Sequence, residues 1–454
     1  MGKRKKTGLY ITIVSIIIVL GTLGWFLNGI FEGEKPGIKV ELLPEFISDS
    51  TTFTMITNDN KSGLKHLKIV LEQEGRKINL FEKRFPFQGL INRDGFHSFE
   101  KELSINPSKL NLAQGGMELN IYVWDYSRRR GGDGNRTLFR HKMVVDTIPP
   151  AVRAVSRRHY INLGGTGLVI YQTSSDTVES GLFVNDNYFP GTLNDQDSKQ
   201  GLHVCFFAVP YNTKPNPDIY LWAKDRAGNY SKATFYYNIR RKRFPTDTIN
   251  VSDTFLKRVL PYFSNYSFDP GASDINKFLQ INRNVRAENN LVLFNLRTKT
   301  APVQIWKGKW LRLGNAANMA GFGDRRQYVY HGKMVDKEIH LGIDLASFTN
   351  ADVQAANNGR VIFTGSLGIY GQTVVLDHGQ GLASIYSHLS EIRVKPDQEV
   401  SKGEIIGRTG KTGLAAGDHL HFGIMVSGVP VNPIEWWDSH WIQDNIIIKQ
   451  AVLK

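Results

Sequence analysis

The strongest pattern in the sequence is an uninterrupted apolar run near the N-terminus. No charged residue occurs between Lys6 and Glu32, and most positions in the run are Ile, Val, Leu, Trp or Phe. About 24 residues at about 1.5 Å per residue give an α-helix of roughly 36 Å, which exceeds the hydrocarbon core of a bilayer, about 30 Å. The run therefore predicts a transmembrane helix over residues 8–31, preceded by a short tail of residues 1–7.

A cleaved signal peptide is the alternative explanation of this run. Its apolar region would be about 7 to 15 residues long and would end in small residues. Here the run is longer and ends in Trp25, Phe26 and Asn28, so we favour an uncleaved anchor. Because residues 3–6 are all Lys or Arg, the tail is expected in the cytoplasm. The rest of the chain is then expected outside the inner (cytoplasmic) membrane, in the periplasm or an equivalent extracytoplasmic space.

Two segments in the middle of the chain alternate apolar and polar positions and resemble each other. Ile121-Tyr122-Val123-Trp124 and Ile219-Tyr220-Leu221-Trp222 are both followed by a turn that contains Asp. Their separation is close to the size of one immunoglobulin-like sandwich, about 100 residues. We therefore predict two immunoglobulin-like β-sandwich modules, over residues 38–148 and 149–243, with both tryptophans in their cores.

After the second module the periodicity changes from two towards 3.6. Residues 254–260 and 274–289 carry apolar side chains at helical spacing, with Asp253 placed to cap the first helix and Pro261 to end it. These residues predict a short helical connector over 244–300. Short β segments punctuated by glycine then predict a compact antiparallel β domain over 301–440, before a C-terminal tail of residues 441–454. The predicted fold is mostly β.

Composition adds a basic surface to this picture. The 56 Lys and Arg residues outnumber the 42 Asp and Glu residues, which gives a net charge of +14 and favours an anionic partner. Because most of the chain is expected to be exported, we predict contact with anionic lipid or a charged wall polymer, and no nucleic acid. The single cysteine, Cys205, excludes an intrachain disulfide and is expected to be buried in its apolar run.

The last third of the chain concentrates residue types that bind metals. His340 and Asp344 are four residues apart, and His419 and His421 are two apart, which puts both imidazoles on one face of a strand. Four residues of straight strand would cover about 13 Å, so the chain must bend before Asp344, and Gly342 permits this. Two imidazoles and one carboxylate would complete a hydrolytic zinc site with an open position for water. Spacing does not decide which of His419 and His421 binds the metal.

These motifs resemble the lysostaphin/LytM-type zinc metallopeptidases over residues 333–436. The resemblance implies one Zn²⁺ per chain with His340, Asp344 and His421 as ligands, and His388 and His419 as the catalytic pair. Residues 415–418 depart from the usual Ser, Gly and Pro of the family, which removes no ligand. The matching segments are the HxxxD motif at 340–344, SHLS at 387–390, GEIIG at 403–407, the Thr-Gly turn at 412–413 and HLHF at 419–422.

The resemblance further implies a zinc metalloendopeptidase that cuts peptide bonds of peptidoglycan, in stem peptides or cross-bridges, during cell-wall remodelling. One alternative is a regulator of wall hydrolases with little activity of its own, because some relatives have lost ligands, although all five positions are filled here. A second alternative is a wall-binding module carried by the two sandwiches. Tyr370 lies in a segment similar to one near the family's groove, and we interpret His331, His378 and His440 as structural.

Overall fold

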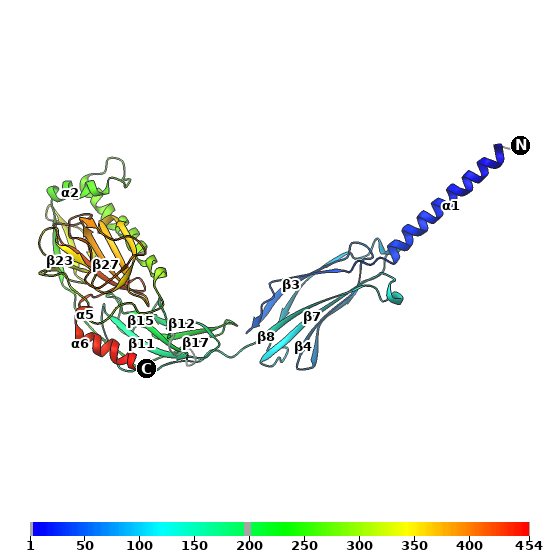
Figure 1. Cartoon of the computed structure of the whole chain (residues 1–454), viewed down its shortest axis with the longest axis horizontal. Helices are drawn as coiled ribbons and strands as arrows, with labels where there is room; N and C mark the ends of the chain where they lie inside the picture. The colour runs from blue at the N-terminus through cyan, green and yellow to red at the C-terminus, as the bar shows by residue number, and fades with distance from the viewer. Residues whose placement is uncertain (1–2, 195–200, 454) are drawn as a thin grey trace. The chain divides into compact units, whose positions relative to one another are not determined.

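The computed structural model describes residues 3–194 and 201–453. Contacts divide the chain into two compact units, residues 1–149 with 226–229, and residues 150–225 with 230–454. Figure 1 shows the strands that dominate both units. The fold is mostly β, as the alternating patterns predict.

The N-terminal apolar run forms one helix, α1 (Lys3–Ile30). Its segment Gly8–Ile30 is long and apolar enough to cross a membrane, and most of its side chains are exposed. An apolar helix that presents its side chains to the surroundings is stable only where those surroundings are apolar. The helix is therefore compatible with the predicted single-pass anchor.

The first unit packs a three-stranded sheet against a five-stranded sheet. Alternate residues of the central strands fill the space between the sheets, among them Ile69, Ile121 and Val123. One sheet has the order β1 (Gly37–Glu41), β3 (Thr51–Asn58), β6 (Ser98–Ile105), and the other has the order β2 (Phe46–Ile47), β8 (Arg136–Val145), β7 (Gly115–Asp125), β4 (Leu64–Gln73), β5 (Arg76–Arg84).

The second unit begins with another β domain, whose core contains the buried Cys205. It has two four-stranded sheets and a parallel pair. The sheets have the orders β14 (Thr192–Leu193), β15 (Leu202–Ala208), β11 (Thr166–Thr173), β9 (Val152–Ala154) and β13 (Asn187–Pro190), β12 (Thr177–Val184), β16 (Ile219–Asp225), β17 (Tyr230–Ala233), and the pair is β10 (His159–Asn162) with β18 (Tyr237–Arg240).

The expectation that Trp124 and Trp222 are core residues is wrong. Both are half-buried on the outer faces of their sheets, because the period of two buries Val123 and Leu221 instead. Trp124 stacks on His66 with ring centroids 4.8 Å apart. The alternating pattern predicts the strands, but it does not show which of their two faces is buried. The immunoglobulin-like assignment of the two domains stays a prediction.

The predicted connector contains the expected helices and one extra strand. The first helix, α2 (Asp253–Val259), is capped by Ser252, whose Oγ accepts a hydrogen bond from the Phe255 amide at 3.1 Å, and not by Asp253. The second runs as continuous helical turns from Asp274 to Asn295. The elements are β19 (Thr246–Val251), α2, η4 (Leu260–Phe263), α3 (Asp274–Gln280), the π-helical η5 (Ile281–Val285), α4 (Arg286–Asn295) and η6 (Leu296–Lys299).

The C-terminal domain is built on an eight-stranded antiparallel sheet. The order is β20 (Ala317–Ala320), β23 (Ile343–Ala346), β31 (Leu420–Val426), β27 (Leu382–Leu389), β26 (Gln372–Asp377), β25 (Gly359–Ser366), β29 (Glu399–Val400), with β32 (Val429–Val431) paired to β31. Two smaller sheets flank it. They are β19, β21 (Arg325–Tyr330), β22 (Lys333–Ile339), and β24 (Asp352–Gln354), β30 (Ile405–Arg408), β28 (Glu391–Ile392), while η7 (Gly368–Tyr370) connects β25 to β26.

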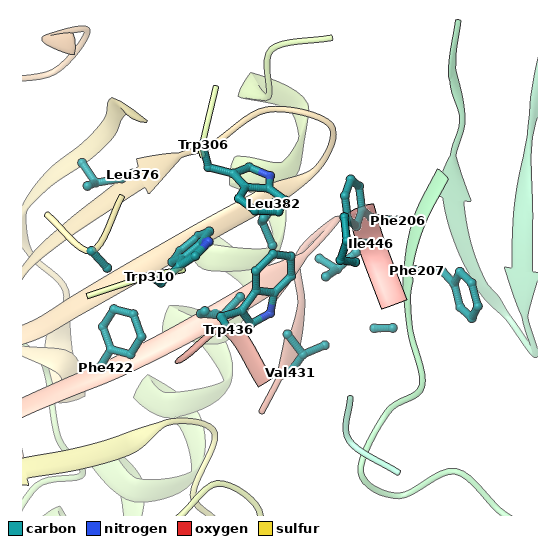
Figure 2. Packing of buried hydrophobic residues seen from close by; sticks show 14 of the residues in the cluster. Phe206, Phe207, Trp306, Trp310, Leu376, Leu382, Phe422, Val431, Trp436 and Ile446 are labelled. Atoms are coloured by element: carbon teal, nitrogen blue, oxygen red, sulfur yellow. The ribbon is translucent and has the colours of Figure 1, made fainter. Parts of the chain in front are cut away.

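A shared core joins this domain to the β domain before it. Figure 2 shows Trp306, Trp310 and Trp436 packed together, with Phe206 and Ile446 in the same cluster. The predicted C-terminal tail is helical through residue 453 and contributes to that cluster. The helical elements at this end of the chain begin before the predicted tail, and they are α5 (Ile434–Trp437), α6 (Ser439–Ile442), η8 (Gln443–Ile447), α7 (Ile448–Gln450) and η9 (Ala451–Leu453).

Candidate active site

Strands β23 and β31 and the bend before β23 bring the three predicted metal ligands to one point. Asp344 and His421 are directly paired across these strands, and His340 lies just before β23. The Nε2 atom of His340 is 2.9 Å from Asp344 Oδ1 and 2.9 Å from His421 Nδ1. The last pair of atoms, His421 Nδ1 and Asp344 Oδ1, is also 2.9 Å apart. Three potential ligand atoms thus form a compact triangle.

The bend expected between His340 and Asp344 is present. Residues 340–342 lie outside the strands, and β23 starts at Ile343. A Cβ atom on Gly342 would lie 2.5 Å from His421 Nε2, which is closer than any side chain allows. Glycine is therefore needed here for the close approach of the imidazole, in addition to the bend.

Neighbouring groups orient two of the three ligand atoms. The Nδ1 atom of His340 is 2.9 Å from the Gly321 carbonyl oxygen, so this nitrogen donates a proton and Nε2 keeps its lone pair. Arg326 Nη2 donates to Asp344 Oδ2 at 2.7 Å. That contact occupies one carboxylate oxygen and turns the other, Oδ1, towards the histidines.

The electrostatics of the three groups favour the protonation states that bind metals. Burial by itself would raise the pKa of Asp344, but His340, His419 and His421 outweigh it and hold this pKa well below its usual range. Burial lowers the pKa of His421 to about 4. An ionised carboxylate and a neutral imidazole are the forms that coordinate a metal ion.

His388 and His419 lie beside this triangle. His388 is the penultimate residue of β27 and has a positive φ of 63°, and its Nδ1 donates to the Thr412 carbonyl oxygen at 2.8 Å. The two imidazole rings have centroids 4.8 Å apart, and His419 Nε2 is 3.6 Å from Asp344 Oδ1. Burial lowers the pKa of His388 well below its usual value. For His419, burial also acts to lower the pKa, but the nearby Asp344 carboxylate and the Gly417 carbonyl together outweigh burial and raise the pKa.

All five residues open onto one cavity of about 480 Å³. Part of its wall comes from the connector, through Phe255, Phe278 and Asn290. The Tyr370 hydroxyl donates to Asn290 Oδ1 at 2.8 Å, so α4 holds the side chain that the sequence placed near the groove. The connector is therefore a wall of the candidate site.

Sequence reasoning missed Arg326 and Asn290. Each acts through a partner far away in the chain, and no fixed spacing announces such a pair. The signal that could have suggested Arg326 is weak: it is an arginine near the start of an alternating strand, and a further strand separates it from the HxxxD motif. The histidines interpreted as structural lie elsewhere. His378 is buried against Asn358 and Ser384 in its hairpin, and the side chains of His331 and His440 are largely exposed.

The donor set suits zinc. Two imidazole nitrogens and one carboxylate oxygen form the three-ligand arrangement typical of hydrolytic zinc sites, and the cavity adjoins them on one side. Neutral imidazole and carboxylate ligands favour Zn²⁺ over Ca²⁺ or Mg²⁺, which take all-oxygen sites. The residues present therefore fit this metal.

Comparisons with known proteins agree with this chemistry. Residues 338–433 match Peptidase family M23. A stretch of 113 residues is 36% identical to the DD-carboxypeptidase/endopeptidase Mpg of Neisseria meningitidis, covering 25% of each chain. Another of 96 residues is 40% identical to the peptidoglycan DD-endopeptidase ShyA of Vibrio cholerae, covering 21% of this chain and 22% of that one.

Among solved structures, the catalytic domain of the antimicrobial peptidase lysostaphin from Staphylococcus simulans is 27% identical. It covers 29% of this chain and 98% of its own length, with a TM-score of 0.24. The chain spans about a quarter of the length of the curated relatives described above. The family match and the curated relatives confirm the resemblance noted in the sequence, and residues 338–433 of this chain form a domain of Peptidase family M23.

Proposed function

We propose that this chain is a zinc metalloendopeptidase that hydrolyses peptide bonds in peptidoglycan. The observation that carries the proposal is the convergence of His340 Nε2, Asp344 Oδ1 and His421 Nδ1 beside a cavity that two further histidines adjoin. The names of the relatives, a DD-carboxypeptidase/endopeptidase and a peptidoglycan DD-endopeptidase, support the peptide part of the wall as the substrate.

In this proposal His340, Asp344 and His421 hold one Zn²⁺ per chain. Zinc bound there supplies a Lewis acid that activates water for attack on an amide carbonyl. Arg326 keeps Asp344 turned so that a single oxygen faces the histidines, and the Gly321 carbonyl keeps His340 in the tautomer with Nε2 unprotonated.

His388 and His419 are the proposed catalytic pair. Each is anchored through Nδ1 to a backbone carbonyl, of Thr412 and Gly417, at 2.8 Å and 2.9 Å. This anchoring leaves each Nε2 available to accept a proton from the attacking water, or to donate one to the oxyanion or to the departing amine. Tyr370, fixed by Asn290, shapes the wall against which an extended peptide would lie.

We place the protein in the inner membrane, with a single span and the catalytic domain outside. The length and hydropathy of α1 and the basic residues before it support this location. The family match of the C-terminal domain agrees, because peptidoglycan lies outside that membrane.

Digestion of purified cell walls by the zinc-loaded full-length chain in detergent tests the function. We expect mass analysis to find soluble peptides with new termini within stem peptides or cross-bridges, and none with the His388→Ala variant. Intact walls after prolonged incubation with a zinc-saturated, folded protein would contradict the proposal.

A further inference from the structure

The residues that follow α1 are fixed to the first β domain. The backbone amide of Arg128 donates to the Ile30 carbonyl oxygen at 2.7 Å, and Arg129 Nε donates to the Phe31 carbonyl oxygen at 2.7 Å. The two bonds hold the last residue of the helix and the residue after it. The helix therefore continues into the domain through specific contacts, without a free linker at this point.

Glu32 adds further contacts to this junction between α1 and the first β domain. Its side chain is only 4% exposed, and its Oε1 accepts a hydrogen bond from Ser62 Oγ at 2.9 Å. Its backbone carbonyl accepts from Ser127 Oγ at 2.9 Å and from Asn135 Nδ2 at 3.1 Å. Moving Glu32 out of this position would leave several buried polar groups without hydrogen-bond partners, which is costly. The contacts therefore hold the end of α1 on the domain.

A strained loop of the first domain lies beside the last turn of α1. A Cβ atom on Gly29 would come 3.3 Å from Ile91 Cδ1, so Ile91 packs directly on the helix. The loop is bent by positive φ angles at Gly89 and Ile91, of 70° and 53°. Two large apolar side chains in the same loop project outward, Phe87 with 53% and Leu90 with 68% of their surface exposed.

The position of this loop follows from the end of the apolar helix. The span candidate ends at Ile30, so its last turn would lie at the level of the lipid headgroups. That turn lines one pocket together with Phe87, Leu90 and Ile91, which then lie at the same depth. Arg128 to Arg130 are exposed beside them, and aromatic, aliphatic and arginine side chains are those favoured where hydrocarbon meets headgroups.

We propose that residues 87–91 and 128–130 form a juxtamembrane face that rests on the outer surface of the bilayer. Phe87 and Leu90 insert into the interfacial region, and the arginines contact anionic lipid headgroups. The occupant is lipid, because the face adjoins the point where a membrane helix leaves the bilayer. This proposal rests on α1 staying in the membrane, and it is independent of the proposed peptidase activity.

Spin labels on the full-length chain in vesicles test this proposal. Single cysteines at positions 87 and 90, in a Cys205→Ala background, are compared with one at Lys77, an exposed residue in the hairpin beyond β4. Since β4 has 10 residues, that hairpin is about 30 Å from the start of the strand near the junction. We expect the labels at 87 and 90 to be more accessible to oxygen than to a water-soluble relaxant, and the label at 77 to show the reverse.

Flotation of the vesicles after a carbonate wash first establishes that the chain is inserted. If the chain floats and positions 87 and 90 are as exposed to water as position 77, the proposal is overturned. Failure to float would overturn it as well, because no bilayer would then surround the junction.

A second comparison tests the contribution of the arginine charges. Vesicles with phosphatidylglycerol should increase the oxygen preference at position 90 over purely zwitterionic vesicles, and the Arg128→Gln/Arg130→Gln double variant should remove that increase. An equal preference in both vesicles would exclude the role of the arginines.

Discussion

Among the residues that the structure describes, two fully buried groups of three side chains have the composition of metal sites, and they differ in chemistry and in surroundings. In each group the potential ligand atoms lie within 4.8 Å of one another, and all side chains are buried. One belongs to the first unit and the other to the C-terminal domain. The carboxylate triad is Glu32, Asp59 and Asp125, and the His-Asp triad is His340, Asp344 and His421.

The carboxylate triad has structural partners. Asp125 accepts hydrogen bonds from the Ser127 and Asn135 amides at 3.0 Å and 2.7 Å, and Asp59 accepts from the Gly63 amide at 2.7 Å. Burial raises the pKa of Asp125 to about 6, although these donors act against the increase. The group orders the junction beneath α1.

The His-Asp triad faces the cavity, with two further histidines beside it. Its donors differ in type, and its outer contacts from Arg326 and Gly321 turn ligand atoms inward. The difference between the two triads shows that proximity of titratable side chains is not sufficient to make a catalytic metal site. A hydrolytic zinc site needs donors that suit zinc, a fixed orientation of those donors and an adjoining space, and of these two groups the His-Asp triad combines all three.

The largest expected effect comes from Asp344→Ala. We expect the zinc content of the full-length chain to fall from one ion per chain to near zero, and wall digestion to disappear. The matched Asp59→Ala variant should keep its zinc, because its triad is structural. Metal analysis after dialysis against a weak chelator makes the comparison. Stoichiometric zinc in Asp344→Ala would remove this ligand assignment.

His388→Ala and His419→Ala should separate metal binding from turnover. Each variant is expected to retain zinc and to lose about 10²- to 10³-fold in kcat, the range for removal of a proton-transfer or oxyanion-stabilising group. The exposed His331 gives the control, since His331→Ala should digest walls at the parental rate. A parental rate in either catalytic variant would show that its assigned role is wrong.

Arg326→Gln tests whether orientation of the carboxylate matters. Loss of a partner that orients a ligand typically weakens metal binding by about 10- to 100-fold. We expect a shift of this size in competition with a fluorescent zinc chelator. Arg325→Gln is the matched control, because this neighbouring side chain is exposed. Equal zinc affinity of the two variants would show that Arg326 does not orient Asp344.

Asn290→Ala should have a smaller effect, because it changes only the wall of the cavity and not the metal ligands. A neutral hydrogen bond contributes about 0.5–1.5 kcal/mol, so kcat/KM should fall by about 2- to 10-fold while zinc content stays unchanged. Combination with Tyr370→Phe should add little, because both changes remove the same bond. Asn295→Ala, at the exposed end of α4, is the control. Fully additive losses would mean that the two residues act independently.

The smallest effect we predict is an opposite response of the two units to acid. The raised pKa of Asp125, about 6, stabilises the first unit at low pH, and this contribution is lost as the pH rises through 6. Burial lowers the pKa values of His159, His203 and His378 to about 4, so they stabilise the second unit above pH 6.5 and lose this contribution as the pH falls through 4.

Calorimetry of the metal-free full-length chain between pH 4 and 7 measures these slopes. We expect two unfolding transitions that move in opposite directions with pH. Asp125→Asn should flatten the pH dependence of the first unit only. Parallel shifts of both transitions would contradict the difference between the two buried environments.

Sequence patterns predicted the chemistry of the site better than its surroundings. The alternation of His419, Leu420 and His421 placed both imidazoles on one face, because strand geometry is local. The choice between them as ligand required the cross-strand register that pairs His421 with Asp344. Contacts such as Arg326 with Asp344 could not be predicted, since they depend on how separate strands lie beside each other.

In the fold, too, local features could be predicted from the sequence and long-range contacts could not. Hydrophobic length predicted α1, and alternation predicted strands in both β domains. Alternation did not show whether Trp124 and Trp222 lie on the buried or the outer face of their strands, because an aromatic residue can cover an outer face as well as fill a core. The packing of the connector against the groove depends on long-range contacts such as Asn290 with Tyr370, which no local pattern encodes.

Anomalous diffraction at the zinc edge, from crystals of the zinc-loaded protein, tests the central claim most directly. We predict one peak per chain, surrounded by His340 Nε2, Asp344 Oδ1 and His421 Nδ1, and no peak at the carboxylate triad. A peak among Glu32, Asp59 and Asp125, or no peak at the His-Asp triad in a protein that has bound zinc, would contradict the account.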